Sequence, residues 1–386
     1  MARMAEVYIV DALRTPMGRR NGGLSGFHPA DLGGAVMREL VERAGIDPGL
    51  IDDVVVGCIS QFGAQAFNLA RTAWLSAGLP ESVPAVTVDR QCGSSQQALH
   101  FAAQGIRAGD YDLAIAGGIE LMSLVPLNCS GEWGEDLGVG YPFSGEGWTK
   151  RYGSDRVHQF SSGERIAAKW GITREEMERF ALASNQRAEQ AWAEGRFDRE
   201  VHRVNELDSD ETIRRGTTLE KMATLKPISE GGVITAGTAS QIADAATGVL
   251  LASEEAVERH GLTPRARIRS MVAAGSDPWL MLTAPIPATE KVLRKAGLGM
   301  DDIDLFEINE AFATVVLAWA HDTGADLERT NVNGGAIALG HALGATGTRL
   351  MTTLLHELER REARFGLETV CEGGGQANAT IIERVS

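Results

Sequence analysis

One order of strand-like and helix-like segments occurs twice in this 386-residue chain, and this repeat constrains the fold more than any other feature. Apolar and β-branched runs begin at residues 7, 53, 85 and 113, and a second set begins at residues 266, 303, 330 and 368. Corresponding starts are 259, 250, 245 and 255 residues apart, a nearly constant offset. The pattern predicts two copies of one α/β unit, and the alternative is two unrelated domains of similar rhythm.

Segments with helical periodicity fill the connections between the expected strands. In the first copy they cover residues 30–43, 68–77 and 94–108, and in the second copy residues 288–296, 312–323 and 345–361. A further strand is expected at residues 379–382. Strands that alternate with helices in this way are typical of the α/β class, in which helices cover a buried sheet.

A different kind of sequence separates the copies. Residues 121–241 are rich in glycine, tryptophan and charge, and a long insertion of this kind commonly covers a substrate site. The alternative is a solvated helical appendage. Thr173, followed by Glu176, predicts a capped helix that runs to about Trp192. The expected domains are residues 1–120 with 242–263, then 121–241, then 264–386.

Composition and charge argue against several functions. A formal net charge of −15 and a pI near 5.1 disfavour a surface that binds nucleic-acid phosphates. No apolar stretch approaches the roughly 18 residues of a membrane span, and charged residues precede any signal-like run. We therefore expect a cytoplasmic protein with no nucleic-acid or membrane partner.

The four cysteines are dispersed singly, without zinc-ligand spacing, so neither a disulfide framework nor a metal site is predicted. Cys58 ends an apolar run and is expected to be a buried strand residue. Cys129 lies in a loop-like stretch and is assigned no role. The other two, Cys92 and Cys371, each adjoin a glycine-containing turn after an expected strand.

Cys92 is a candidate nucleophile because a β-branched run stops just before it and a helix-permissive segment begins just after it. A thiol at a helix start lies near free backbone N–H groups and the positive end of the helix dipole, which favour the thiolate. Gly93 and Ser94 are small and leave the sulfur reachable. The alternative is a buried structural cysteine.

His341 lies in a run with five glycines, residues 331–347, directly after an expected strand. Such glycine density indicates tight turns and close backbone approach, which an ordinary core histidine does not require. Gly340-His341-Ala342 stands where a P-loop would have Gly-Lys-Ser/Thr, so nucleotide binding is disfavoured. A histidine held in this loop is suited to act as a general base or an oxyanion donor.

Two further segments carry candidate polar groups. Cys371 is followed by a glycine turn whose backbone N–H groups could form an oxyanion pocket, and its thiol could act as an acid or base. Asn309 begins the segment Asn-Glu-Ala-Phe just past an expected strand. Its amide could orient a water or His341, or it could serve only as a helix N-cap.

These four blocks, in this order, resemble the thiolase family. The sequence of these segments is most similar to that of actinobacterial 3-ketoacyl-CoA thiolases associated with sterol-ring breakdown. The resemblance covers essentially the whole chain. It implies an α/β fold with two similar halves in a five-layered α-β-α-β-α arrangement and an inserted loop domain. It also implies no permanently bound cofactor, acyl-CoA and coenzyme A as substrates, and a homodimer or homotetramer.

The resemblance implies a role for each reactive residue. His341 takes the proton of Cys92, whose thiolate attacks the 3-keto carbon of a 3-ketoacyl-CoA. Cys371 protonates the departing acetyl-CoA carbanion, and coenzyme A then accepts the acyl group from Cys92. The thioester oxygen would face His341 and a water held by Asn309. The tetrahedral oxyanion would face the backbone N–H groups of Cys92 and Gly373.

Binding roles are implied for three more residues, and some positions depart from the family pattern. Ser240 matches a position that contacts the pantetheine arm, and Met281 and Phe312 match the walls of the acyl pocket. Ala342 stands where the family usually has proline, which removes a φ constraint from the His341 loop. Gln159 stands where many members have methionine over the acyl chain.

Several other functions share part of this pattern. A decarboxylating ketoacyl synthase would have the same duplicated fold but no second catalytic thiol, so Cys371 argues against it. A sterol-carrier-type thiolase would have His-Asp-Cys-Phe at 309–312. Biosynthetic Claisen condensation of two acetyl-CoA molecules uses the same residues as thiolysis and stays open, as does a non-catalytic CoA-binding relative.

Overall fold

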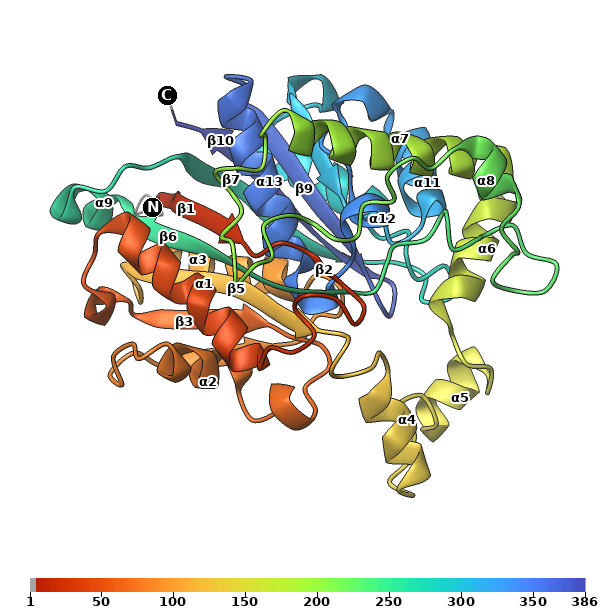
Figure 1. The fold of residues 1–386 in the computed structure, drawn as a ribbon, viewed down its shortest axis with the longest axis horizontal. Helices are drawn as coiled ribbons and strands as arrows, with labels where there is room; N and C mark the ends of the chain where they lie inside the picture. The colour runs from red at the N-terminus through yellow and green to blue at the C-terminus, as the bar shows by residue number, and fades with distance from the viewer. Residues whose placement is uncertain (1–4, 386) are drawn as a thin grey trace.

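The computed structural model describes residues 5–385 (Figure 1). The strands of the first half are β1 (Val7–Arg14), β2 (Gly18–Arg19), β3 (Asp53–Gly57), β4 (Ala85–Val88), β5 (Leu113–Leu121) and β6 (Ala243–Ser253). Its helices are α1 (Pro29–Ala44), α2 (Leu69–Ser76), α3 (Ser94–Ala108) and α9 (Glu254–His260). The second half contains β7 (Ala266–Gly275), β8 (Leu305–Ile308), β9 (Phe365–Glu372) and β10 (Gln376–Arg384), with α10 (Pro285–Ala296), α11 (Ala313–Thr323), α12 (Ala336–Leu339) and α13 (Thr346–Arg360).

Five helices lie between β5 and β6, in the region predicted to be an insertion. They are α4 (Cys129–Asp136), α5 (Glu146–Tyr152), α6 (Gln159–Trp170), α7 (Arg174–Ala193) and α8 (Leu219–Ala223). The capping box expected at Thr173 and Glu176 is present at the start of α7. In Figure 1, α4 and α5 project away from the body of the molecule, whereas α7 lies along the second half. Cys129 is the first residue of α4, so the loop expected there is wrong.

The strand order confirms the duplication. The sheet runs β4-β3-β5-β6-β1-β7-β10-β9-β8. Within residues 5–385, β1 and β7 join its two halves through the pairs Tyr8–Arg267 and Ile9–Ala266. From its outer edge, the first half reads β4-β3-β5-β6-β1. The second half reads β8-β9-β10-β7 and has a single bridge between Phe306 and Thr330 in place of the β4 pairing. The strand predicted at residues 330–333 is thus reduced to one bridge.

Three hydrophobic cores define five layers. One core lies between the first sheet half and α1 and α2, and it includes Trp74. A central core holds α3 and α13 between the two sheet halves, and Leu99 and Leu355 meet there. A third core packs α10 and α11 on the outer face of the second half around Trp319. The α-β-α-β-α arrangement is therefore confirmed, with α13 visible in the middle of Figure 1.

Most predicted elements agree closely with the structure because their end signals are local. The α1 helix has a proline at its first position and ends at Gly45, whose φ is 66°. The α3 helix has the predicted bounds. β9 begins at Phe365, three residues before the predicted start, because Phe365 and Leu367 are buried strand residues although charge interrupts the sequence around them. Cys58 is buried, directly after β3.

The strand register aligns residues of the two halves. Asp53 of β3 pairs with Ala114 of β5, and Leu305 of β8 pairs with Gly366 of β9. Glu120 lies six residues after Ala114, and Glu372 lies six residues after Gly366. The two glutamates are thus equivalent, each near the carboxyl end of a strand that has a parallel neighbour on one side and an antiparallel neighbour on the other.

Candidate active site

The four motif blocks meet at the carboxyl ends of the parallel strands. Cys92 directly precedes Gly93, the N-cap residue of α3. Asn309 directly follows β8, and Cys371 is the second-last residue of β9. His341 lies between α12 and the turn of residues 343–345 that leads into α13. Each reactive side chain therefore stands where a strand or helix fixes its backbone.

Asn309 connects the base and the second thiol. Its amide nitrogen Nδ2 lies 3.4 Å from His341 Nε2 and 3.5 Å from Cys371 Sγ. Its Oδ1 is buried without a hydrogen-bond partner. A buried amide oxygen of this kind is suited to hold a water. Asn309 does not cap a helix, because α11 begins at Ala313 with Phe312 as its N-cap residue.

Thr346 fixes the tautomer of His341. The Thr346 hydroxyl donates to the carbonyl oxygen of Ala342 at 2.9 Å, so it accepts a hydrogen bond from His341 Nδ1, which lies 2.6 Å away. The proton on Nδ1 leaves Nε2 as the free basic nitrogen, on the side of Asn309. Burial, assisted by the Arg349 charge, lowers the pKa of His341 to about 3. The imidazole is thus neutral and able to accept a proton.

Replacing Thr346 with valine should lower kcat by at least about tenfold, because His341 loses the acceptor that holds its Nδ1 proton. Thr346→Ser retains the hydroxyl and is the matched control. Steady-state kinetics of both variants test this expectation. If the valine variant keeps the full kcat, the hydroxyl does not fix the tautomer.

Cys92 is only 9% exposed, and its pKa is raised well above the ordinary value. Burial is the largest cause, and the nearby Cys371 and Glu372 also raise this pKa. The backbone N–H of Cys92, just before α3, lowers this pKa as expected, but burial outweighs its effect in the protein without substrate. Cys92 is therefore a neutral thiol, and a base must remove its proton before the sulfur can attack as a thiolate.

Cys371 is completely buried, and burial raises the pKa of its thiol to about 12. The Asn309 amide and the backbone N–H of Ala311 act in the opposite direction. A thiol in this environment keeps its proton at neutral pH and yields it only to a strong base. A carbanion next to a thioester is such a base.

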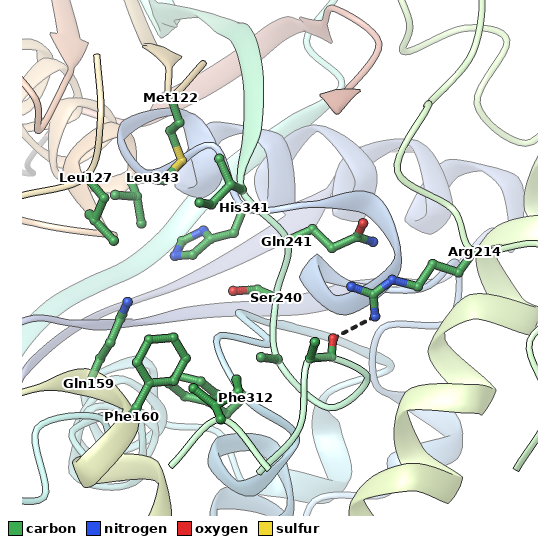
Figure 2. A pocket seen from close by; sticks show the side chains of 14 residues that line it. Met122, Leu127, Gln159, Phe160, Arg214, Ser240, Gln241, Phe312, His341 and Leu343 are labelled. Carbon is green, nitrogen blue, oxygen red and sulfur yellow. Dashed lines mark hydrogen bonds between the residues drawn. The ribbon is translucent and has the colours of Figure 1, made fainter. Parts of the chain in front are cut away.

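A pocket of about 280 Å³ opens over His341 (Figure 2). Ser240 and Phe312 line it as expected, and so does Gln159. Met281 does not line it but packs in the same hydrophobic cluster as Phe312. The lining residues that were not singled out from the sequence include Met122, Leu127, Phe160 and Arg214.

The pocket has an apolar end and a cationic end. Phe160 contacts Phe312 edge to face, with ring centroids 5.4 Å apart. At the opposite side in Figure 2, Arg214 donates to the carbonyl oxygen of Ala236 at 2.8 Å. This division suits a ligand with an acyl chain at one end and an anionic group at the other.

Ala342 has a φ of −72°, close to the value that proline would impose. The loop therefore adopts the conformation of the usual family residue without its constraint. We expect Ala342→Pro to raise the free energy of unfolding by about 0.4–1 kcal/mol, because the unfolded chain loses freedom. Urea denaturation measures the change. A lower stability would show that the pyrrolidine ring does not fit this buried position.

The comparisons with known proteins agree with this geometry. The model of the thiolase N-terminal domain matches residues 7–255, and the model of the thiolase C-terminal domain matches residues 262–384. The chain belongs to the thiolase family, whose members are acyltransferases. The sequence-based recognition of the family is thus confirmed.

Relatives match over nearly their whole length. The steroid 3-ketoacyl-CoA thiolase FadA6 of Mycobacterium tuberculosis is 53% identical over all of this chain and 95% of its own length. A 3-ketoacyl-CoA thiolase of Aliivibrio salmonicida is 44% identical over 99% of this chain and 100% of its own length. The crystal structure of human mitochondrial 3-ketoacyl-CoA thiolase has a TM-score of 0.90 at 36% identity and covers 99% of both chains.

Proposed function

We propose that this protein cleaves a 3-ketoacyl-CoA with coenzyme A, giving acetyl-CoA and a shortened acyl-CoA through an acyl-enzyme on Cys92. The observation that carries the proposal is the placement of a free basic nitrogen, His341 Nε2, beside Asn309 at the same strand ends as the two thiols. The names of the relatives support degradative thiolysis over Claisen condensation.

The first half-reaction begins when His341 Nε2 takes the proton of the Cys92 thiol. The sulfur attacks the 3-keto carbon, and the resulting oxyanion accepts hydrogen bonds from the backbone N–H groups of Cys92 and Gly373. The bond between Cα and Cβ then breaks, and its electrons move onto acetyl-CoA as an enolate. Protonated His341 and a water held by Asn309 stabilise this enolate, each by on the order of 10²-fold in rate.

Cys371 completes the first half-reaction by giving its proton to the α-carbon, which releases acetyl-CoA. Its thiolate then takes the proton of the incoming coenzyme A. The coenzyme A sulfur attacks the acyl group on Cys92, and the Cys92 thiolate leaves and recovers its proton from His341. Both thiols and the imidazole return to their starting forms, so the cycle balances.

The pocket supports a binding mode for acyl-CoA. We place the pantetheine arm against Ser240, an anionic group of coenzyme A toward Arg214, and the acyl chain near Phe160, Phe312 and Gln159. Met281 supports the Phe312 wall from behind. The segment of residues 121–241 supplies several lining residues, and we propose that it covers the substrate and selects the acyl group.

The identity to a steroid 3-ketoacyl-CoA thiolase supports a bulky, ring-bearing acyl group as the substrate. A relative from Escherichia coli is named beta-ketoadipyl-CoA thiolase and is 43% identical, so a short dicarboxylic acyl group is the main alternative. No permanently bound cofactor has a role in this cycle. Within residues 5–385, no helix is long and apolar enough to cross a membrane, and the cytoplasmic location stays a prediction.

We propose that the protein forms a homodimer or homotetramer. β4 is an edge strand, and it carries the exposed side chain of Val86. Phe101 on the neighbouring helix α3 is also exposed. An unpaired edge with exposed apolar side chains is suited to pair with a second copy of the chain, and light scattering would measure the mass in solution.

The test of the proposed reaction is intact-protein mass spectrometry after mixing with acetyl-CoA, acetoacetyl-CoA and ring-bearing 3-ketoacyl-CoA substrates. We expect an acyl adduct that maps to Cys92, release of coenzyme A or acetyl-CoA according to the donor, and removal of the adduct by added coenzyme A. Absence of an adduct with every donor would overturn the proposal and favour a non-catalytic CoA-binding relative.

A further inference from the structure

Glu372 is a buried carboxyl group that the proposed cycle does not use. It is the last residue of β9, directly after Cys371, and its side chain is completely buried. Neither carboxyl oxygen has a well-formed hydrogen bond, and the nearest donor is the backbone N–H of Asn378. Burying a carboxyl group without hydrogen bonds costs free energy of folding. Its presence beside a reactive thiol therefore suggests a function.

The equivalent residue of the first half, Glu120, is fully paired. Its carboxylate accepts hydrogen bonds from the backbone N–H groups of Ile59, Ser60 and Gly344 at 2.8–3.1 Å, and from the Gln65 amide at 3.1 Å. The Gly344 bond joins the first half to the loop before α13. Glu120 thus shows how a glutamate at this position holds the start of the other half's central helix.

The two halves differ in where their backbone amides are directed. In the second half, Ala311 is equivalent to Ile59, and its N–H is directed at Cys371 Sγ instead of at the glutamate. The catalytic thiol therefore takes a donor that the anchoring glutamate has in the first half. Glu372 therefore lacks one of the donors that Glu120 has.

The carboxyl group of Glu372 lies against the α-carbon of the residue that follows the nucleophile. A Cβ atom built on Gly93 would lie 1.9 Å from Glu372 Oε1 and 2.7 Å from its Cδ. No side chain fits at Gly93 while Glu372 stays in place. Glu372 thereby meets the start of α3, as Glu120 meets the loop before α13.

The charges around Glu372 bear on its ionisation. Burial raises the pKa of Glu372 to about 9, and Asp89 acts in the same direction. The Arg90 charge and the backbone N–H of Asn378 lower this pKa. Arg90 donates to Gln376 Oε1 at 3.1 Å. Both thiols are close enough for a negative charge on Glu372 to raise their pKa values. A carboxyl group that stays protonated at neutral pH therefore spares Cys92 this repulsion.

We propose that Glu372 is a positioning residue for Cys92, whose uncharged carboxyl group holds the start of α3 in place and whose ionisation opposes formation of the Cys92 thiolate. The proposal rests on the assignment of Cys92 as the nucleophile. It extends that assignment to the second half of the chain, which would control both the position and the reactivity of a thiol carried by the first.

Glu372→Gln tests the electrostatic part, because the amide has the same shape but cannot ionise. We would follow alkylation of Cys92 by iodoacetamide, with peptide mapping, between about pH 7 and pH 10. The ratio of the variant rate to the wild-type rate should rise by about tenfold across this range, since only the wild type acquires a charge beside the thiol. A ratio that does not change with pH overturns the proposal. Alkylation needs no turnover of acyl-CoA, so this result is separate from the test of the proposed reaction.

A second measurement examines whether Glu372 is protonated in the folded protein. An unfolded glutamate has a pKa of about 4.3, so the folded protein would retain a proton that the unfolded chain releases. The free energy of unfolding of the wild type should then fall relative to Glu372→Gln as the pH rises from about 5 to 9. Parallel stability curves would contradict this. If Glu372→Gln does not fold, Glu372→Met serves in both experiments.

The positioning part is tested by a double-mutant cycle. Gly93→Ala should reduce the rate of Cys92 acylation by at least about tenfold, because the new methyl group would overlap the Glu372 carboxyl group. Gly93→Ala with Glu372→Ala should recover most of that loss, since the second change vacates the same space. If Glu372→Ala gives no recovery, contact with Glu372 is not what constrains Gly93.

Discussion

Cys92→Ser is expected to lower thiolysis by on the order of 10⁴-fold or more, with no acyl adduct detectable by mass spectrometry. The physical reason is that the proposed cycle routes every acyl group through this sulfur. A serine hydroxyl is a far weaker acid than a thiol, and His341, a weak base in its buried environment, cannot ionise it. Removal of a residue that forms the covalent intermediate is among the largest single effects known in enzymes.

The control for this variant is its structure and its binding of ligand. Serine differs from cysteine only in having an oxygen in place of the sulfur. The melting temperature and the affinity for coenzyme A should therefore stay close to those of the wild type. Activity above about 1% of the wild-type value would mean that the thiol of coenzyme A attacks the 3-keto carbon directly, with no acyl-enzyme. Cys92 would then have no covalent role.

Cys371→Ala is expected to divide the two half-reactions. Acyl transfer from an acyl-CoA to Cys92 should persist, because the nucleophile and His341 are intact. Exchange of the α-protons of acetyl-CoA with deuterated water should fall by on the order of 10³-fold, since the proposed cycle moves that proton through Cys371 and uses Cys92 as the nucleophile. Complete thiolysis should fall with it.

Deuterium incorporation measured by NMR and adduct formation measured by mass spectrometry separate these two outcomes. Equal loss of both half-reactions in Cys92→Ser and Cys371→Ala would contradict the division of labour between the thiols. Proton exchange that persists in Cys371→Ala would assign the acid role to another group, with His341 as the first candidate.

Sequence patterns predicted the α/β class, the duplication and most element bounds, because local periodicity and end signals determine them. Ser94–Ala108 agrees with α3 at both ends, and the helix predicted at residues 30–43 agrees with α1 to within one residue at each end. The four reactive blocks were also found from the sequence, since each combines a reactive side chain with a turn after a strand. The roles assigned to their residues stay predictions.

What sequence patterns did not predict depends on contacts between distant segments. Thr346 was not singled out, because its importance comes from the hydrogen bond between its hydroxyl and His341 Nδ1. Burial outweighs the expected effect of the helix start on the pKa of Cys92, and burial is a property of the whole fold. Arg214 and Phe160 reach the pocket from the insertion, whose packing has no repeat to guide a prediction. Glu372 has no sequence signal of its own, because its equivalence to Glu120 depends on the strand register.

The internal two-fold relation has a consequence for how such a site can arise. Each half places the start of its central helix on the strand ends of the other, at Glu372 in one direction and at Glu120 in the other. A single half could build this core only as a homodimer, and identical subunits must carry identical residues at both positions. Joining the halves in one chain allows the two positions to differ. Glu120 can then keep its backbone N–H donors as an anchor, while on the Glu372 side a backbone N–H can be directed at the reactive thiol instead.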